Sequence, residues 1–240
     1  MEPDAFQTTD GVGMTAVTAQ EMREVDRVAV EEVGLGLLQM MENAGRNLAA
    51  RVGRFEPSRV TVFAGNGGNG GGGMACARHL ANRGVAVEVV LDRPPEAFYG
   101  AAASQHRVLE AMGVPVSVGP IDHAPDGLVV DALVGYGLEG AIRGTARELV
   151  ETVRAVPGRV VSLDVPAGME ATTGATFGPS VPADLVVTLA LPKTGLRKLD
   201  GALVLADIGI PTVVFDRAGV PYDPPFRDGP LVELRQKSGE

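Results

Sequence analysis

The sequence contains no tryptophan, and aromatic residues make up only 4% of its 240 residues. Proteins that bind single-stranded nucleic acid stack bases on aromatic side chains, so this composition disfavours that class. Basic residues are also outnumbered, because 21 Lys and Arg stand against 30 Asp and Glu and give a formal net charge of -9. Such a charge repels phosphate backbones and anionic membrane surfaces, so we expect neither nucleic acid nor a membrane as a partner.

Cysteine, long apolar runs and hydrolase motifs are equally scarce. Cys76 has no second cysteine to pair with inside the chain, which favours a reducing compartment. No apolar run approaches the roughly 18 residues that span a bilayer, and the N-terminus has no basic segment followed by an apolar one. We therefore expect a cytoplasmic protein. Because no Gly-x-Ser-x-Gly motif occurs, nothing supports nucleophilic hydrolase chemistry.

A chain of this length with 45% hydrophobic residues can bury one large core. We therefore predict a single domain over residues 18–240. Residues 1–17 have no sustained periodicity and are predicted to form a flexible N-terminal tail. The prolines at the other end predict an irregular C-terminal segment; they are Pro221, Pro224, Pro225 and Pro230.

Apolar runs alternate with helix-like segments along most of the chain. The run 128–134 is almost continuously apolar, as expected of a strand that is covered on both faces. This alternation predicts a parallel sheet between layers of helices, with ligands bound beyond the carboxyl ends of the strands. The other strands are expected at 59–64, 85–91, 114–118, 159–164, 183–189 and 202–208, and the helices at 18–34, 37–52, 74–83, 100–112 and 145–156.

The glycine-rich segment Gly65–Gly73 lies between the first of these strands and a helix expected from Met74. A glycine backbone can approach a ligand closely, and a helix N-terminus presents free N–H groups. We therefore predict a loop that cradles a phosphate or another anion; a flexible surface linker is the alternative. The spacing Gly65-x-Gly67-x-x-Gly70 also fits a dinucleotide fingerprint, with Asp92 placed where a ribose-binding acid is expected.

Two acidic residues, Asp131 and Asp164, end predicted strands at the expected ligand edge. A partly buried carboxylate there can act as a general acid or base, or bind a hard cation. Alternatively, each carboxylate only caps a neighbouring loop through backbone hydrogen bonds. Lys193 follows another strand and is predicted either to meet a phosphate or to be a solvated loop residue.

Five motifs stand in a fixed order along the chain. They are Met40-Met41-Glu42-Asn43-Ala44-Gly45, the glycine segment followed by Ala77-Arg78-His79-Leu80, Asp131-Ala132-Leu133-Val134-Gly135-Tyr136-Gly137, Ser162-Leu163-Asp164-Val165-Pro166-Ala167-Gly168 and Leu191-Pro192-Lys193-Thr194-Gly195. Together they resemble one family, the NAD(P)H-hydrate epimerases or YjeF N-terminal domain family. The resemblance covers about 18–212 and implies a Rossmann-like three-layer αβα sandwich, often dimeric, with a mostly parallel central sheet. It implies an epimerase that interconverts the R and S epimers of NADHX and NADPHX, the hydrated forms of NADH and NADPH, for repair by a separate dehydratase.

The resemblance also assigns individual residues. It implies that Asp164 is the catalytic acid beside the hydrated nicotinamide ring, and that Asn69, Asp131 and Ala167 bind a potassium ion. The residues implied to contact the substrate form two loops and include the catalytic acid: Gly68, Asn69, Gly70, Gly71, Gly72, Gly135, Tyr136, Gly137, Leu138, Glu139, Gly140, Ala141 and Asp164.

The sequence departs from the family pattern within two of these motifs. Gly68 and Gly72 replace the usual asparagine and aspartate of the glycine loop, and Ala167 replaces the usual serine, a potassium ligand. These changes would remove a polar contact to the substrate and a hydroxyl group at the cation. A catalytically impaired nucleotide-binding module of the same fold is therefore the alternative function. An NAD-dependent dehydrogenase would need a second, substrate-holding domain, which we do not find.

Overall fold

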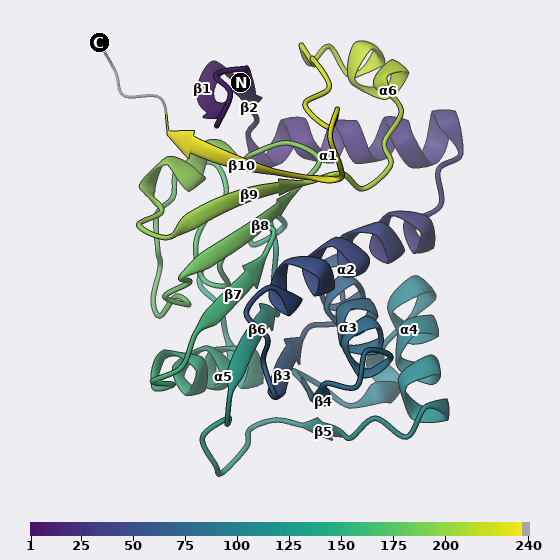
Figure 1. The fold of residues 1–240 in the computed structure, drawn as a ribbon, viewed down its shortest axis with the longest axis vertical. Coiled ribbons are helices and arrows are strands. Elements are labelled where there is room, and N and C mark those ends of the chain that lie inside the picture. Colours follow the sequence, from purple (N-terminus) through teal and green to yellow (C-terminus); the bar gives the residue numbers. More distant parts are fainter. Residues whose placement is uncertain (237–240) are drawn as a thin grey trace.

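The computed structural model describes residues 1–236, which form one ten-stranded sheet flanked by helices (Figure 1). The strand order is β2-β1-β10-β9-β8-β7-β6-β3-β4-β5; the strands from β9 to β5 are parallel, and β10, β1 and β2 pair antiparallel. This arrangement confirms the predicted α/β fold with a mostly parallel central sheet. The strands are β1 Glu2–Thr8, β2 Gly13–Ala16, β3 Arg59–Ala64, β4 Ala86–Leu91, β5 Val116–Val118, β6 Leu128–Ala132, β7 Val160–Leu163, β8 Leu185–Leu189, β9 Ala202–Ala206 and β10 Leu231–Gln236.

Helices cover both faces of the sheet. The helices α2, α3 and α4 lie side by side on one face, while α5 packs on the other through Leu149, Val150 and Val153 against strand residues such as Phe63 and Val129 (Figure 1). The first helix, α1, continues into a π-helix at Val28–Val33. The helices are α1 Ala19–Arg27, α2 Leu37–Gly53, α3 Gly68–Ala81, α4 Gly100–Ala111, α5 Gly144–Arg154 and α6 Thr212–Arg217.

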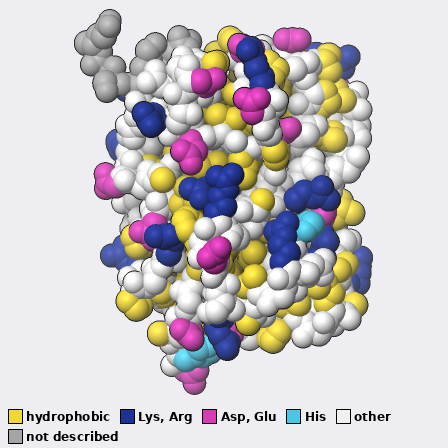
Figure 2. All heavy atoms as spheres, viewed as in Figure 1, with side chains coloured by type: hydrophobic (Ala, Val, Ile, Leu, Met, Phe, Trp, Pro, Cys, Tyr) yellow, Lys and Arg dark blue, Asp and Glu magenta, His cyan; other side chains and the backbone are white. Residues whose placement is uncertain are grey.

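The surface carries no continuous basic area on the face shown in Figure 2, where Lys and Arg side chains form small groups separated by acidic and apolar ones. This face therefore offers little to a nucleic-acid backbone. Among residues 1–236, no helix has the length and apolar character needed to cross a membrane.

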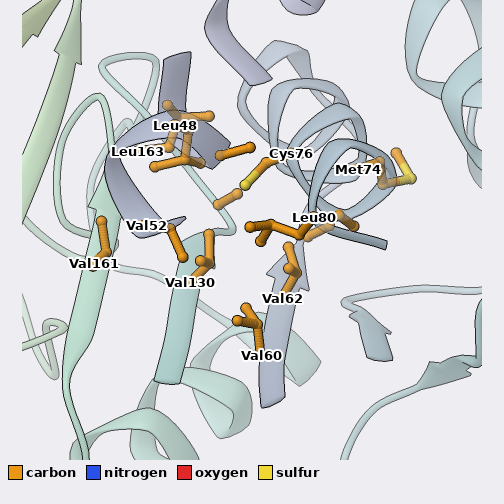
Figure 3. Packing of buried hydrophobic residues seen from close by; sticks show 14 of the residues in the cluster. Leu48, Val52, Val60, Val62, Met74, Cys76, Leu80, Val130, Val161 and Leu163 are labelled. Atoms are coloured by element: carbon orange, nitrogen blue, oxygen red, sulfur yellow. The ribbon is translucent and has the colours of Figure 1, made fainter. Parts of the chain in front are cut away.

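The core beneath α2 and α3 explains why the predicted strands form. Val60 and Val62 of β3 point toward these helices together with Val130 of β6 and Val161 of β7 (Figure 3). Every residue of β6 is buried, which agrees with a strand covered on both faces. The core therefore holds the parallel strands in register, so that their carboxyl ends meet at one edge.

The predicted flexible tail at residues 1–17 is wrong. Residues 2–8 and 13–16 form β1 and β2, and Phe6 is fully buried against Leu234 and other residues of the sheet's antiparallel part. Because the two strands are short and mixed in polarity, their sequence gives no clear period; pairing with β10 stabilises them.

The predicted irregular C-terminal segment also needs correction. The proline-rich stretch is irregular up to Pro230, but Leu231–Gln236 then forms β10, which pairs with β9 and β1. The chain ends therefore meet in the same sheet. Residues 237–240 of this predicted segment lie outside the described residues.

Candidate active site

A cavity of about 580 Å³ lies at the carboxyl edge of the parallel strands. Its walls come from the segments that follow β3, β4, β6, β7 and β8, with α1 and the start of α2 on the opposite side. This is the position that the rule for open α/β sheets predicts. The cavity therefore brings together loops that are far apart in the sequence.

The glycine-rich segment enters the cavity as a helix N-terminus, which corrects the predicted long loop. The helix α3 begins at Gly68, so only Gly65–Gly67 form the turn after β3. Gly67, Gly68 and Asn69 line the cavity. The first N–H groups of a helix have no partner within it, and the positive end of the helix dipole favours negative charge. The geometry suits binding of an anion such as a phosphate.

The following glycines serve packing. A Cβ atom on Gly70 would overlap the carbonyl oxygen of Gly65, and one on Gly71 would meet the Met41 sulfur. Gly70, Gly71 and Gly72 are buried, and none of them lines the cavity. These three positions are therefore not open to a substrate from the cavity.

Gly72 faces the interior between α2 and β7. A Cβ atom there would lie 2.9 Å from Leu163 Cδ2 and 3.6 Å from Ala44 Cβ. A carboxylate at this position would point into apolar surroundings. The absence of aspartate at residue 72 therefore removes no group from the cavity, contrary to the interpretation of the sequence.

Asp164 is held by a buried ion pair. The Lys193 ammonium group donates to Asp164 Oδ1, and the Tyr136 backbone N–H donates to Oδ2 at 2.9 Å. Lys193 is 1% exposed and also donates to the Leu189 carbonyl oxygen at 2.8 Å, so it is not a solvated loop residue. Asp164 has a φ of 68°, a left-handed conformation uncommon outside glycine. Both side chains line the cavity.

Asn69 lies next to this carboxylate. Its Oδ1 and Nδ2 atoms are buried, and neither has a hydrogen-bond partner among residues 1–236. A Cβ atom on Gly135 would lie 3.1 Å from Asn69 Oδ1 and 2.8 Å from Asp164 Oδ2, so only glycine allows this close approach. Because buried amides are nearly always hydrogen-bonded, the unpartnered Asn69 marks a place for a ligand.

Asp131 and Ala167 form a separate, fully buried contact. Asp131 accepts hydrogen bonds from the Ser162 hydroxyl at 2.7 Å, the Ala167 N–H at 2.9 Å and the Leu133 N–H at 3.2 Å. Burial raises the pKa of Asp131 in spite of these donors. The carboxylate thus joins β6 to the segment after β7, which agrees with the predicted alternative of a loop cap. Neither Asp131 nor Ala167 lines the cavity.

The second predicted substrate loop reaches the cavity only at its start. Gly135, Tyr136 and Gly137 line it, whereas Leu138, Glu139, Gly140 and Ala141 do not. Glu139 is exposed and forms an ion pair with Arg23 of α1 at 2.9 Å.

Sequence reasoning missed Asp26 of α1. Its carboxylate lines the cavity and accepts a hydrogen bond from the Tyr136 hydroxyl. Burial raises the pKa of Asp26, and burial also raises the pKa of Tyr136. The signal was present in the sequence, because Asp26 follows Met22 by four residues and therefore lies on the apolar face of its helix.

The opposite end of the cavity is more open. Asp92 follows β4, is 7% exposed and pairs with Arg93 Nη2 at 2.7 Å. Tyr99, just before α4, is 73% exposed and also lines the cavity. Asp92 thus lies where the dinucleotide fingerprint predicts a ribose-binding acid.

Comparison with known proteins identifies the family. The chain is 46% identical over 241 residues to the NAD(P)H-hydrate epimerase of Dehalogenimonas lykanthroporepellens, with 95% of this chain and 96% of that protein covered. It is 38% identical to the bifunctional NAD(P)H-hydrate repair enzyme Nnr of Salinibacter ruber, of which it spans only 42% while 84% of this chain is covered. The crystal structure of yeast ynu0 superposes with a TM-score of 0.78 at 25% identity, covering 92% of this chain and 100% of the yeast chain. A profile of the family described as YjeF-related protein N-terminus matches residues 37–195. The chain therefore belongs to the YjeF-related N-terminal family.

Proposed function

We propose that this chain is an NAD(P)H-hydrate epimerase, an isomerase that interconverts the R and S epimers of NADHX and NADPHX. The observation that carries the proposal is the placement of Asp164 and the N-terminus of α3 in one cavity. The free N–H groups of Gly68 and Asn69 suit the pyrophosphate of a dinucleotide. The buried carboxylate then lies beside a bound nicotinamide ring.

The chemistry needs proton transfer and no redox step. Inversion at C6 of the hydrated ring requires a bond to that carbon to break and form again. A positioned carboxyl group promotes this by giving a proton to the leaving group or taking one from the entering group. Asp164 is suited to such a role because Lys193 and the Tyr136 N–H fix its orientation.

The alternative, a nucleotide-binding module that has lost turnover, depends mainly on the missing loop aspartate. Since residue 72 faces Leu163 and Ala44 and not the cavity, its loss gives that alternative little support. We expect Gly72→Asp to lower stability by about 1–3 kcal/mol because it buries a polar group without partners. A large gain in epimerase rate in this variant would instead favour the impaired module.

The potassium ion is also part of the proposal. The residues present fit a monovalent cation in one respect, which is the side-chain oxygen of Asn69. The Asn69 Oδ1 atom is a buried oxygen without a partner among residues 1–236, and Asp131, whose carboxyl group already accepts three hydrogen bonds, is the acidic member of the implied set. Ala167 has no side-chain oxygen; its carbonyl accepts from the Val181 N–H at 2.9 Å and retains one lone pair. A bound cation would fix the geometry of these loops. Thermal melting in KCl against tetramethylammonium chloride tests this, and Asn69→Ala should abolish any potassium-specific stabilisation.

The remaining parts of the proposal concern the setting of the reaction. We propose a cytoplasmic homodimer that supplies a separate dehydratase with its substrate epimer. The buried thiol of Cys76, with a pKa raised by burial, fits a reducing compartment. Light scattering of the purified protein tests the dimer.

The direct experiment measures the conversion of purified R-NADHX to S-NADHX by chromatography. We expect the protein to accelerate the conversion well beyond the spontaneous rate, for NADPHX as well. Equal rates with and without the protein would reject the proposal. Tight nucleotide binding without acceleration would favour the impaired module.

A further inference from the structure

Two carboxyl groups face the cavity within reach of one tyrosine. The Tyr136 hydroxyl donates to Asp26 Oδ2, and the backbone N–H of the same residue donates to Asp164 Oδ2 at 2.9 Å. Asp26 comes from α1 and Asp164 from the end of β7, so the two groups enter the cavity from different elements. Tyr136 therefore links both carboxyl groups at the wall of one cavity.

The two carboxyl groups differ in whether a positive charge lies directly beside them. Asp164 has the Lys193 ammonium group as a direct partner, whereas Asp26 has the neutral phenol of Tyr136. The arginines on either side of Asp26 in α1 are engaged elsewhere. Arg23 pairs with Glu139 at 2.9 Å, and Arg27 pairs with Glu24 and Glu32.

The surroundings of Asp26 favour its neutral form. Burial raises its pKa, the negative charge of Asp164 raises it further, and the Tyr136 hydrogen bond and the Lys193 charge only partly oppose this. The charged and titratable groups that face the pair are Tyr136, Lys193, Asp164 and Arg23. When two neighbouring carboxyl groups have environments that differ in this way, the neutral one suits proton donation and the ionised one suits proton acceptance.

We propose that Asp26 is a second catalytic residue, the general acid of the epimerisation, and that Asp164 is its general base. This inference rests on the proposed function. It changes the role implied for Asp164 from acid to base, because the contact with the buried Lys193 ammonium group suits this carboxyl group to accepting a proton.

The step balances in atoms and charge. The Asp26 carboxyl proton passes to the C6 hydroxyl oxygen, the C6–O bond breaks with its electron pair on oxygen, and water leaves. The lone pair of the ring nitrogen N1 forms a double bond to C6. Water then adds to the opposite face of C6, the electron pair of the N1–C6 double bond returns to N1 as its lone pair, and Asp164 takes the proton released. One proton has moved from Asp26 to Asp164. The opposite epimerisation uses the two groups in exchanged roles, and a further turnover in the same direction follows once both groups have exchanged protons with water.

The variant Asp26→Asn tests the inference in the full chain. The amide can still accept the Tyr136 hydrogen bond, so the fold should persist, which a melting curve checks. We expect kcat for R-NADHX to fall about 100-fold or more, the lower range for loss of a general acid, with KM changed by less than about threefold. Asp26→Ser, which also lacks an acidic proton, serves as a second variant if the first melts far below the wild type.

The pH dependence of kcat distinguishes a catalytic role of Asp26 from a purely structural one, because a structural role would leave this dependence unchanged. Because the acid must carry its proton, the wild-type kcat should decline as the pH rises through the pKa of Asp26. That decline should be absent from the residual activity of Asp26→Asn. The matched control is Glu24→Gln, an exposed carboxylate of the same helix, which should retain wild-type kcat and pH profile.

The outcomes separate the two proposals. Wild-type protein without epimerase activity would overturn the proposed function and, with it, this inference. An active wild type together with an Asp26→Asn variant that keeps more than half of kcat would overturn the inference alone. A large loss of kcat with an unchanged pH profile would also overturn it, because Asp26 would then be a positioning residue.

Discussion

The two ends of the cavity are built differently. At one end the charged groups of Asp164 and Lys193 are almost fully buried and paired with each other. At the other end Tyr99 is largely exposed, and Arg93 is 44% exposed while it pairs with Asp92. A buried charge acts in a low effective dielectric, whereas an exposed pair is screened by water. Under the proposed function, the buried end would carry the chemistry and the open end would hold the rest of the nucleotide.

Asp164→Asn should have the largest effect on the reaction. The amide keeps the shape of the side chain but cannot accept a proton as a base, so we expect kcat to fall about 10²–10⁴-fold. Affinity for NAD⁺, measured by calorimetry, should change much less. A kcat within tenfold of the wild type would contradict this assignment, because the buried end would then not carry the chemistry.

Lys193→Met should have the largest effect on stability. It leaves the Asp164 carboxylate buried without its cation, which typically lowers the free energy of unfolding by about 3–5 kcal/mol. Denaturant unfolding measures this loss. The double variant Asp164→Asn with Lys193→Met removes both charges and should recover much of the stability but none of the activity. If the double variant is as unstable as the single one, the ion pair is not the cause.

Arg93→Gln should affect binding moderately. An arginine beside the ribose-binding acid can accommodate a 2′-phosphate, so NADPHX should lose affinity relative to NADHX. Because exposed ion pairs contribute about 0.2–1 kcal/mol, we expect a change of at most about fivefold in the ratio of KM values. Arg143→Gln, outside the cavity lining, is the matched control. Equal losses for both substrates would argue against this placement of the ribose.

Tyr99→Ala should have the smallest effect. Its ring lies at the open rim, where stacking on a base would contribute about 0.5 kcal/mol, or roughly a twofold rise in KM. The kcat value should stay unchanged, and steady-state kinetics measures both. A loss of kcat instead of affinity would show that the open end takes part in the chemistry.

The parallel half of the fold could be predicted from the sequence because its central strands, such as β6 and β7, are buried on both faces. Nearly continuous apolar runs such as Leu128–Ala132, interrupted only by Asp131, mark such strands without any knowledge of their neighbours. The antiparallel edge could not be predicted in this way. The residues of β1 and β10 become strands through long-range pairing of the two chain ends, which no local period records.

The sequence pointed to some of the residues that line the cavity, such as Gly68, Gly135 and Asp164, but not to the partners of the charged groups. Glycine has a low helix propensity, so the sequence predicts a loop where α3 begins at Gly68. Close packing against Gly65 and Met41 overrides that preference. The burial of Lys193 and the role of Tyr136 depend on contacts between segments that are distant in the chain. Only their assembly at one sheet edge reveals these contacts.

The pairing of β1 with β10 has a practical consequence for handling the protein. A shortened version that starts at Met14, for example to remove an apparently dispensable leader, would strip the partner from one side of β10. The exposed N–H and C=O groups of that strand would then be open to pairing with another molecule, which invites aggregation. Affinity tags and fusion partners should therefore be attached through linkers that leave residues 2–8 in place.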